Sequence, residues 1–284
     1  MVLTAVLAVG ARRAFALGQL PLLTDETDTP RPQALKVDVA YAFDVTRSAA
    51  GGVARRGRLT RRDMSVPVMQ LNYGMTDRLQ ARLEGRYGLT TGSTDESPAV
   101  GFGDLSAGVK YRFLDQQDSP EDEEDAESSP DEDPHGWSGP VSASIFPQLT
   151  FPTGSRRDAL GDGEYSLFTP LDVGREIGKL TLLAEAAFFW RYHRRSGPNE
   201  LQLGTAAYYA LTEKLYLLGE QRVHLPTVGH ATAQWLVNLG AWYDVTEHLA
   251  VYGAAGRGVR ASDRAEQSDL LLTIGVEVLF GAPR

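Results

Sequence analysis

The chain of 284 residues contains no cysteine, which excludes disulfide bridges, thiolate metal ligands and cysteine nucleophiles. It also lacks any run of 18 consecutive apolar residues, since the longest apolar region, 180–190, is interrupted by Thr181 and Glu185. A membrane-spanning helix needs about 20 such residues, so the sequence offers no candidate for one. With 29 glycines and 9% aromatic residues, the composition instead suits many strands joined by turns.

Basic residues are missing from the stretch 115–134, "DQQDSPEDEEDAESSPDEDP", which holds 11 acids. This block accounts for the net charge of −9, and the rest of the chain is close to neutral. Acidic blocks of this kind are usually disordered and solvated, so we expect a disordered acidic insertion at 115–138. The block lacks the ligand spacing and the glycine turn of a calcium loop, and no metal site is predicted.

The N-terminus resembles an export signal. A short apolar run, "VLTAVLAVGA" (2–11), is followed by the small-x-small triplet "AFA" at 14–16, which predicts a signal peptide at 1–16. No basic residue precedes the apolar run, which fits a signal truncated at its start; the alternative is an ordinary N-terminal helix. Export together with the absence of cysteine indicates a bacterial envelope protein.

Period-two alternation dominates the rest of the chain. In 79–89, for example, the odd positions are mostly apolar and the even positions mostly polar or charged. Side chains alternate between the two faces of a strand, so this pattern predicts strands rather than helices. We expect twelve strands, at about 33–45, 63–74, 78–90, 103–114, 140–151, 165–175, 179–192, 200–210, 214–224, 233–243, 248–259 and 268–280.

One turn phrase recurs three times, in "YGMTDRLQA" (73–81), "YYALTEKLYL" (208–217) and "WYDVTEHLAV" (242–251). Each has a threonine followed by an acid, and such side chains can hydrogen-bond nearby backbone in a tight turn. Short connections alternate with long ones along the chain, which is typical of an up-and-down meander. The short turns would then share one rim with both chain ends, the periplasmic rim of an exported barrel. Strand parity places the acidic insertion at that rim too.

Both a soluble barrel and a transmembrane barrel fit this alternation. The polar faces are rich in Ser, Thr, Gln, Asn and Gly, unlike a soluble surface, and a membrane barrel keeps such residues inside. Aromatic residues at strand ends fit interfacial girdles: Tyr73, Tyr87, Tyr111, Trp190, Tyr192, Tyr209, Trp242 and Tyr243. The stretch "TIGVEVLF" (273–280) resembles the C-terminal assembly signal of outer-membrane barrels at Thr273, Gly275, Val278 and Phe280, with "GAPR" following it as a departure. We therefore predict an all-β, transmembrane, antiparallel up-and-down β-barrel of about 12 strands at 33–280, in the bacterial outer membrane.

Three stretches resemble a known family: "GFGDLSAGVKYRF" (101–113), "FPQLTFPTGS" (146–155) and "GDGEYSLFTPLDVGREIGKLTL" (161–182). They are similar to outer-membrane transporters labelled by the meta-pathway of phenol degradation, which are distantly similar to the fatty-acid and aromatic-hydrocarbon channels. The resemblance implies a passive channel for small molecules, including hydrophobic or aromatic ones. About 17 residues separate the predicted cleavage point from the first strand, too few for the plug domain of the fatty-acid channels.

The charged residues on the predicted inner face are the candidate pore lining. They could set selectivity, or they could cross-link a closed and merely structural lumen through salt bridges. The set is Lys36, Asp38, Arg82, Glu84, Arg86, Lys110, Arg112, Glu185, Arg191, Glu220, Arg222 and Glu277; Asp104 and His224 share the same face.

Catalysis has little support in the sequence. No "GxSxG" elbow is present, and an outer-membrane hydrolase would need a lipid-facing Ser–His pair. We predict no enzyme activity, no catalytic residue and no cofactor, and keep the hydrolase as the less favoured alternative. Predicted partners are outer-membrane lipid, lipopolysaccharide, the barrel-assembly machinery and a small-molecule solute. The basic stretch 54–62 could contact lipopolysaccharide phosphates, and no nucleic acid is expected.

Overall fold

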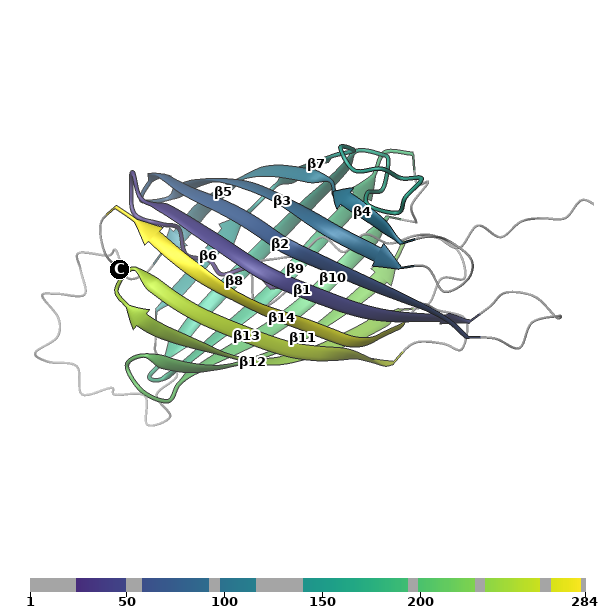
Figure 1. The fold of residues 1–284 in the computed structure, drawn as a ribbon. Coiled ribbons are helices and arrows are strands. Elements are labelled where there is room, and N and C mark those ends of the chain that lie inside the picture. The colour runs from purple at the N-terminus through teal and green to yellow at the C-terminus, as the bar shows by residue number, and fades with distance from the viewer. Residues whose placement is uncertain are drawn as a thin grey trace, which may run out of the picture.

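The computed structural model describes residues 24–49, 58–91, 98–115, 140–193, 199–227, 233–260 and 267–281. Within these ranges the chain forms strands and no helix (Figure 1). The predicted signal peptide at 1–16 and all but the first residue of the acidic insertion at 115–138 lie outside the described residues.

The structure contains fourteen strands in chain order. They are β1 (Leu35–Ala49), β2 (Arg58–Thr76), β3 (Leu79–Thr91), β4 (Ala99–Phe102), β5 (Leu105–Asp115), β6 (Val141–Ile145), β7 (Gln148–Phe151), β8 (Ser166–Ile177), β9 (Leu180–Arg191), β10 (Glu200–Ala210), β11 (Leu215–Pro226), β12 (Gln234–Thr246), β13 (Leu249–Arg260) and β14 (Gln267–Phe280).

All neighbouring strands are antiparallel, and the sheet closes because β1 pairs with both β2 and β14. Two positions in the wall are occupied by interrupted strands. β4 and β5 both pair with β3. β6 and β7 each pair with β5 on one side and with β8 on the other. Each pair of short strands therefore takes the place of one wall strand, and the result is a closed 12-stranded barrel. The predicted fold and strand number are confirmed.

The recurring turn phrase has the expected role. The hydroxyl of Thr76 accepts a hydrogen bond from the amide of Arg78 at 3.3 Å, and Thr246 accepts one from His248 at 3.2 Å. In the third copy, Thr212 accepts from the amide of Leu215 at 3.0 Å. The threonine thus satisfies a backbone donor that the tight turn leaves unpaired. We call the end of the barrel that carries these turns the tight-turn rim.

The described residues on either side of the acidic insertion, Asp115 and Pro140, also lie at the tight-turn rim. The amide of Arg112, near the end of β5, donates to the carbonyl of Arg78 in a tight turn. On the other side of the insertion, the amide of Glu176 donates to the carbonyl of Pro140. The rim expected from strand parity is therefore the one observed for Asp115 and Pro140.

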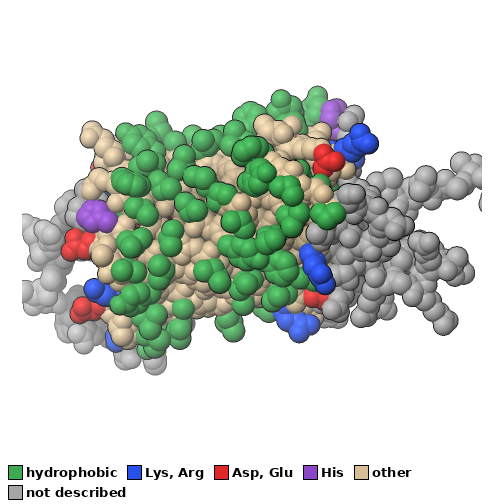
Figure 2. Space-filling model, in the orientation of Figure 1, with side chains coloured by type: hydrophobic (Ala, Val, Ile, Leu, Met, Phe, Trp, Pro, Cys, Tyr) green, Lys and Arg blue, Asp and Glu red, His purple; other side chains and the backbone are tan. Residues whose placement is uncertain are grey.

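The outside of the barrel is a belt of apolar side chains, with charged residues toward its two ends (Figure 2). On β3, Leu83 is 41% exposed whereas its neighbour Arg82 is 3% exposed. On β5, Val109 and Lys110 differ in the same way, at 43% and 0%. Apolar residues face out and charged residues face in, the reverse of a soluble barrel and the arrangement of a membrane barrel. None of the described residues forms a helix suited to crossing a membrane.

The lumen is not uniformly polar, which the sequence did not predict. Trp242, expected in an outer girdle, lies on the inner face and stacks on Tyr252 with ring centres 5.2 Å apart. The reason is parity: Tyr243 faces out, so its neighbour on the strand must face in. Two apolar clusters surround these rings on the inner wall, formed by Leu183, Ala206, Leu218 and Ala254 and by Ala40, Val68 and Tyr252.

Candidate functional site

Residues 24–34 enter the barrel from the tight-turn rim, with Thr24, Asp25 and Thr27 buried inside it, and we call them the luminal segment. At the tight-turn rim, the amide of Gln33 donates to the carbonyl of Gly74 at 2.8 Å, and Gly74 donates back to Ala34 at 3.0 Å. At the inner end of the segment, the amide of Thr24 donates to the carboxylate of Glu220, which lies midway along β11. The chain just before β1 thus reaches from the tight-turn rim to the middle of the lumen.

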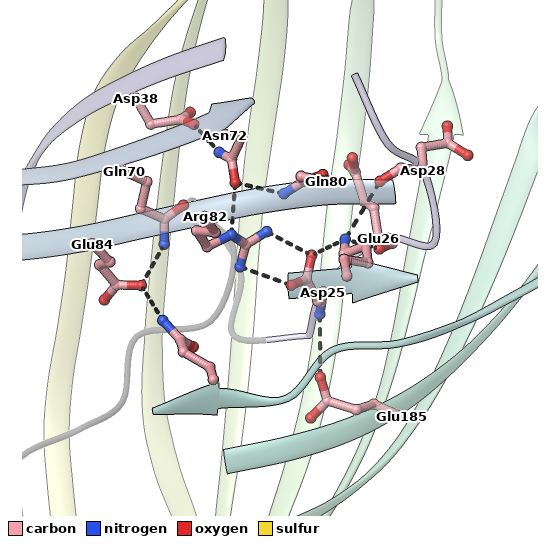
Figure 3. A network of polar contacts seen from close by, with 12 residues as sticks. Asp25, Glu26, Asp28, Asp38, Gln70, Asn72, Gln80, Arg82, Glu84 and Glu185 are labelled. Atoms are coloured by element: carbon pink, nitrogen blue, oxygen red, sulfur yellow. Dashed lines mark hydrogen bonds and ion pairs between the residues drawn. The ribbon is translucent and has the colours of Figure 1, made fainter. Parts of the chain in front are cut away.

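The Asp25 carboxylate is the main ionic anchor of the luminal segment. It lies 2.8 Å and 3.2 Å from the two terminal nitrogens of Arg82 and 2.8 Å from Nζ of Lys110. All three side chains are almost fully buried. A buried carboxylate is tolerable only when such partners compensate for its lost hydration. The segment is thereby joined to two neighbouring wall strands, β3 and β5 (Figure 3).

Further contacts hold the segment along its length. The hydroxyl of Thr27 lies 2.6 Å from that of Ser142 on β6, and Thr29 donates to the carbonyl of Asp77 at 2.9 Å. Lys110 also donates to the carbonyl oxygen of Glu26. These bonds satisfy polar groups that water would otherwise have to reach. The segment is therefore fixed to the wall at several levels rather than lying loosely in it.

Two glycines make room for the luminal segment. A Cβ added to Gly204 on β10 would lie 2.7 Å from the hydroxyl oxygen of Thr24, and one added to Gly74 would collide with the backbone of Arg31. Glycine in a strand often marks close approach of another backbone. The wall sequence is thus adapted to the segment at both of its ends.

Around Asp25, a polar network spans the lumen (Figure 3). Asn72 on β2 accepts hydrogen bonds from Gln80 and from Nε of Arg82, both at 2.7 Å. On the opposite wall, Glu185 accepts from the amide of Asp25 at 3.3 Å and pairs with Arg222 at 2.8 Å. The luminal segment therefore bridges strands that are far apart around the barrel.

The twelve predicted pore-lining residues all belong to the barrel wall, at the alternate positions that face the lumen. Arg82, Lys110, Glu185 and Arg222 join the network around Asp25. The others pair locally: Lys36 with Glu277 at 3.1 Å, Arg112 with Asp115 at 2.6 Å, Arg191 with Glu200 at 3.4 Å, Glu84 with Gln70 at 3.0 Å, Asp38 with Asn72 at 3.4 Å, and Glu220 with Asn238 at 2.8 Å. Arg86 on β3 lies beside Gly103, the glycine that follows β4. Their role as a pore lining stays a prediction.

Several luminal acids escaped the sequence analysis. Asp172 is fully buried on β8, and the alternation of that strand could have placed it on the inner face. Asp25 had no such signal because it lies outside every strand. With these acids included, the buried charged residues in the described part of the chain are nine acids and four bases. The acids are Asp25, Asp38, Asp162, Glu164, Asp172, Glu185, Glu200, Glu220 and Glu277, and the bases are Arg82, Lys110, Arg191 and Arg222.

A cavity of about 450 Å³ opens beside the luminal segment at the tight-turn rim. We call it the vestibule. It is lined by Glu26, Asp28, Thr29, Pro30, Arg31, Ala34, Lys36, Tyr208, Tyr216, Trp242, Asp244, Glu277 and Leu279. At the opposite rim, Asp104 holds the chain after β7 by accepting hydrogen bonds from the amides of Gly154 at 2.9 Å and Asp162 at 2.7 Å.

The geometry gives no support to a hydrolase. His224 Nδ1 lies 3.2 Å from a Glu200 oxygen inside the lumen rather than beside a lipid-facing serine. His193 lies two residues beyond β9, His248 lies in the tight turn between β12 and β13, and His135 and His230 are outside the described residues. Across the described ranges, no group of three or more His, Asp or Glu side chains could hold a metal ion.

No protein-family model and no curated protein matches the chain by sequence. Solved structures do resemble it. The COG4313 outer membrane channel from Pseudomonas putida F1 is 16% identical with a TM-score of 0.66, over 90% of this chain and 98% of that one. KdgM porin is 10% identical with a TM-score of 0.52, over 87% and 99%, and its complex with disordered oligogalacturonate gives 10%, 0.51, 86% and 99%. The protein thus has the fold of outer-membrane channel barrels, as the resemblance predicted.

Proposed function

We propose that this protein is a passive channel of the bacterial outer membrane for small molecules, including hydrophobic or aromatic ones. The observation that carries the proposal is a closed barrel with an apolar outside, a charged inside, and a lumen occupied by a segment that only noncovalent contacts hold. Such a segment can leave the wall without breaking a covalent bond, which a gated channel requires and a merely structural barrel does not. The solved barrels that it resembles include a channel and a porin.

In this conformation the luminal segment occupies the lumen, so conduction requires it to move. The segment carries its own anchor, Asp25, and wall contacts at Thr24, Thr27 and Thr29. Because it joins β1 only at the tight-turn rim, its inner end can leave the wall without unpairing a strand. The wall hydrogen bonds of the barrel would stay intact during opening.

The competing function is a structural barrel with a permanently closed lumen, favoured by the buried ion pairs at the centre. The less favoured hydrolase needs a lipid-facing Ser–His pair, which the described residues do not supply. The solved structures reported above are a channel and a porin. We further propose contacts of the apolar belt with outer-membrane lipid, of residues 54–62 with lipopolysaccharide, and of the C-terminal strand with the barrel-assembly machinery.

A reversible lock tests the channel function. Thr27 and Ser142 have hydroxyl oxygens 2.6 Å apart, and the chain has no cysteine of its own. In the Thr27→Cys/Ser142→Cys variant, a disulfide should hold the segment against the wall. Planar-bilayer recordings should show current steps under reducing conditions that disappear on oxidation, and the single Thr27→Cys variant should conduct under both conditions. Folded, reduced protein that never conducts would favour the structural barrel.

A further inference from the structure

The vestibule has an aromatic wall. Tyr208, Tyr216 and Trp242 project into it from the adjacent strands β10, β11 and β12. Trp242 is supported from behind by its stacking on Tyr252, so its position is fixed by packing. Three aromatic side chains from neighbouring strands thus present a rigid, apolar surface to any molecule in the cavity.

Carboxylates lie against these same aromatic residues. The indole nitrogen of Trp242 donates to Asp244 at 2.9 Å, and the carboxylate of Glu26 on the luminal segment lies beside the Tyr208 side chain in the same cavity. Each carboxylate is therefore close to an aromatic side chain of the wall. An aromatic ring has a negative face, which attracts cations, and a nearby carboxylate adds a full negative charge.

The charge balance of the vestibule is negative. Its lining includes four acids, Glu26, Asp28, Asp244 and Glu277, and two bases, Arg31 and Lys36. Lys36 and Glu277 offset each other as a pair at 3.1 Å, and Asp28 lies 3.7 Å from Arg112, so the excess negative charge comes mainly from Glu26 and Asp244. A smaller adjoining cavity of about 170 Å³ adds Glu176, Arg175 and Asp115, the last of which is paired with Arg112 at 2.6 Å.

We propose that the vestibule binds small organic cations, such as quaternary ammonium compounds that carry an aromatic group. The aromatic wall accepts the apolar part of such a molecule, and the ring faces and carboxylates stabilise its positive charge. A neutral aromatic molecule gains only the first contribution, and an organic anion is repelled. Cavities of this size suit ligands of this class. The transport consequence, preferential passage of cations, rests on the proposed channel function, whereas binding itself does not.

Binding can be measured without any current. The probes are benzyltrimethylammonium, benzyl alcohol and benzenesulfonate, which share one ring and differ in charge. Isothermal titration calorimetry on the folded barrel in detergent should give an affinity for the cation at least about tenfold above that for the alcohol, since a desolvated cation–aromatic contact has about that strength. The sulfonate should bind weakest. Equal affinities for the three probes, or tightest binding of the alcohol, would overturn the proposal.

Variants locate the site. Trp242→Leu and Asp244→Asn should each weaken binding of the cation about tenfold. Because Trp242→Leu also removes a ring that packs on Tyr252, Glu26→Gln provides a second test on the luminal segment, outside every strand. Glu213→Gln is the matched control, since Glu213 lies in a tight turn of the same rim but does not line the vestibule. Unchanged cation binding in both Glu26→Gln and Asp244→Asn would exclude this site.

The two proposals fail in different ways. If the barrel binds the cation selectively but never conducts in bilayers, the channel function is wrong and the binding site stands. If the barrel conducts but binds the three probes alike, the channel function stands and the cation site is wrong. Reversal potentials under a KCl gradient add a check on the second case, because a channel with this vestibule should favour cations and Asp244→Asn should reduce that preference.

Discussion

The Asp25 carboxylate contacts the Arg82 guanidinium through two hydrogen bonds, 2.8 Å and 3.2 Å long, across 57 positions of sequence. This pair fastens the luminal segment to the barrel wall. Asp25→Asn keeps the size of the side chain but removes the carboxylate charge that Arg82 and Lys110 share. Breaking a buried pair in this way typically costs about 3–5 kcal/mol. In this protein the loss lowers the free energy that holds the luminal segment against the wall. Hydrogen exchange of residues 24–29 should accelerate, and bilayer openings should become more frequent.

Asp28→Asn is the control for that variant. The Asp28 side chain is 74% exposed, and its nearest ionic contact with Arg112 is 3.7 Å long. Exposed pairs contribute little to stability, so exchange at 24–29 should hardly change. Equal acceleration in the two variants would mean that the Asp25 pair is not the anchor.

Acidification should release the segment only at low pH. Burial by itself raises the pKa of Asp25, but Arg82 and Lys110 outweigh it and hold that pKa below its ordinary value of 3.8. Because the pKa is lower in the docked state, docking has its full stabilisation above the pKa of the free segment and loses it as the pH falls through the docked value. Conductance should stay constant from about pH 8 to about pH 5 and rise only below about pH 4. A rise between about pH 7 and pH 5 would assign the anchor to another group.

Gly204→Ala tests the fit of the segment without touching its charges. The added Cβ would lie 2.7 Å from the Thr24 hydroxyl oxygen but 3.6 Å from Glu185 and 3.7 Å from Arg222. The clash therefore falls on the segment and spares the wall, and overpacking of this kind costs about 1–3 kcal/mol. Exchange at 24–29 should accelerate, and adding Thr24→Ala should restore protection because it removes the clashing oxygen. Without that rescue, the effect of Gly204→Ala must come from the wall.

Leu83→Arg tests the membrane facing of β3. Leu83 points outward midway along the strand, and arginine at the middle of a lipid-facing surface costs about 2–4 kcal/mol. Chemical unfolding of the protein in lipid vesicles should show a free energy of unfolding that is lower by this amount. Met75→Arg, outward at the tight-turn rim, should cost at most about 1 kcal/mol. Similar losses for the two variants would contradict the assigned depth of Leu83 in the membrane.

Gly275→Asp should impair barrel formation. Gly275 of the predicted assembly signal faces the lumen, where an added Cβ would lie 2.6 Å from the Tyr252 ring and 2.8 Å from Cβ of Ala40. Phe280→Ala should also reduce insertion, because it removes the terminal aromatic of the signal. The measurement is the amount of heat-modifiable barrel in outer membranes. Gly253→Ala, whose Cβ meets only ordinary contacts at 3.5 Å or beyond, should assemble normally, and normal amounts of all three variants would remove the role of Gly275 and Phe280.

Much of the fold could be predicted from the sequence because the evidence for it is local. Each strand that separates lipid from a polar interior must alternate by itself, so stretches such as 79–89 reveal both the strand and the facing of Leu83 and Arg82. The threonine of the tight turns likewise acts within two or three residues. The interruptions between β4 and β5 and between β6 and β7 were not predicted, since they leave the alternation of each wall position almost unchanged.

The sequence by itself determined the barrel, its strand number, its membrane-facing surface and the inner face on which Arg82 and Lys110 lie. Only the tertiary structure decided what those two cations bind. Asp25 sits outside every strand, so no periodicity points to it, and its partners come within reach only once the barrel closes around residues 24–34. The excess of acids among the buried charges and the meeting of Trp242 with Asp244 and of Tyr208 with Glu26 have the same origin. They are contacts across space, which a pattern along one strand does not encode.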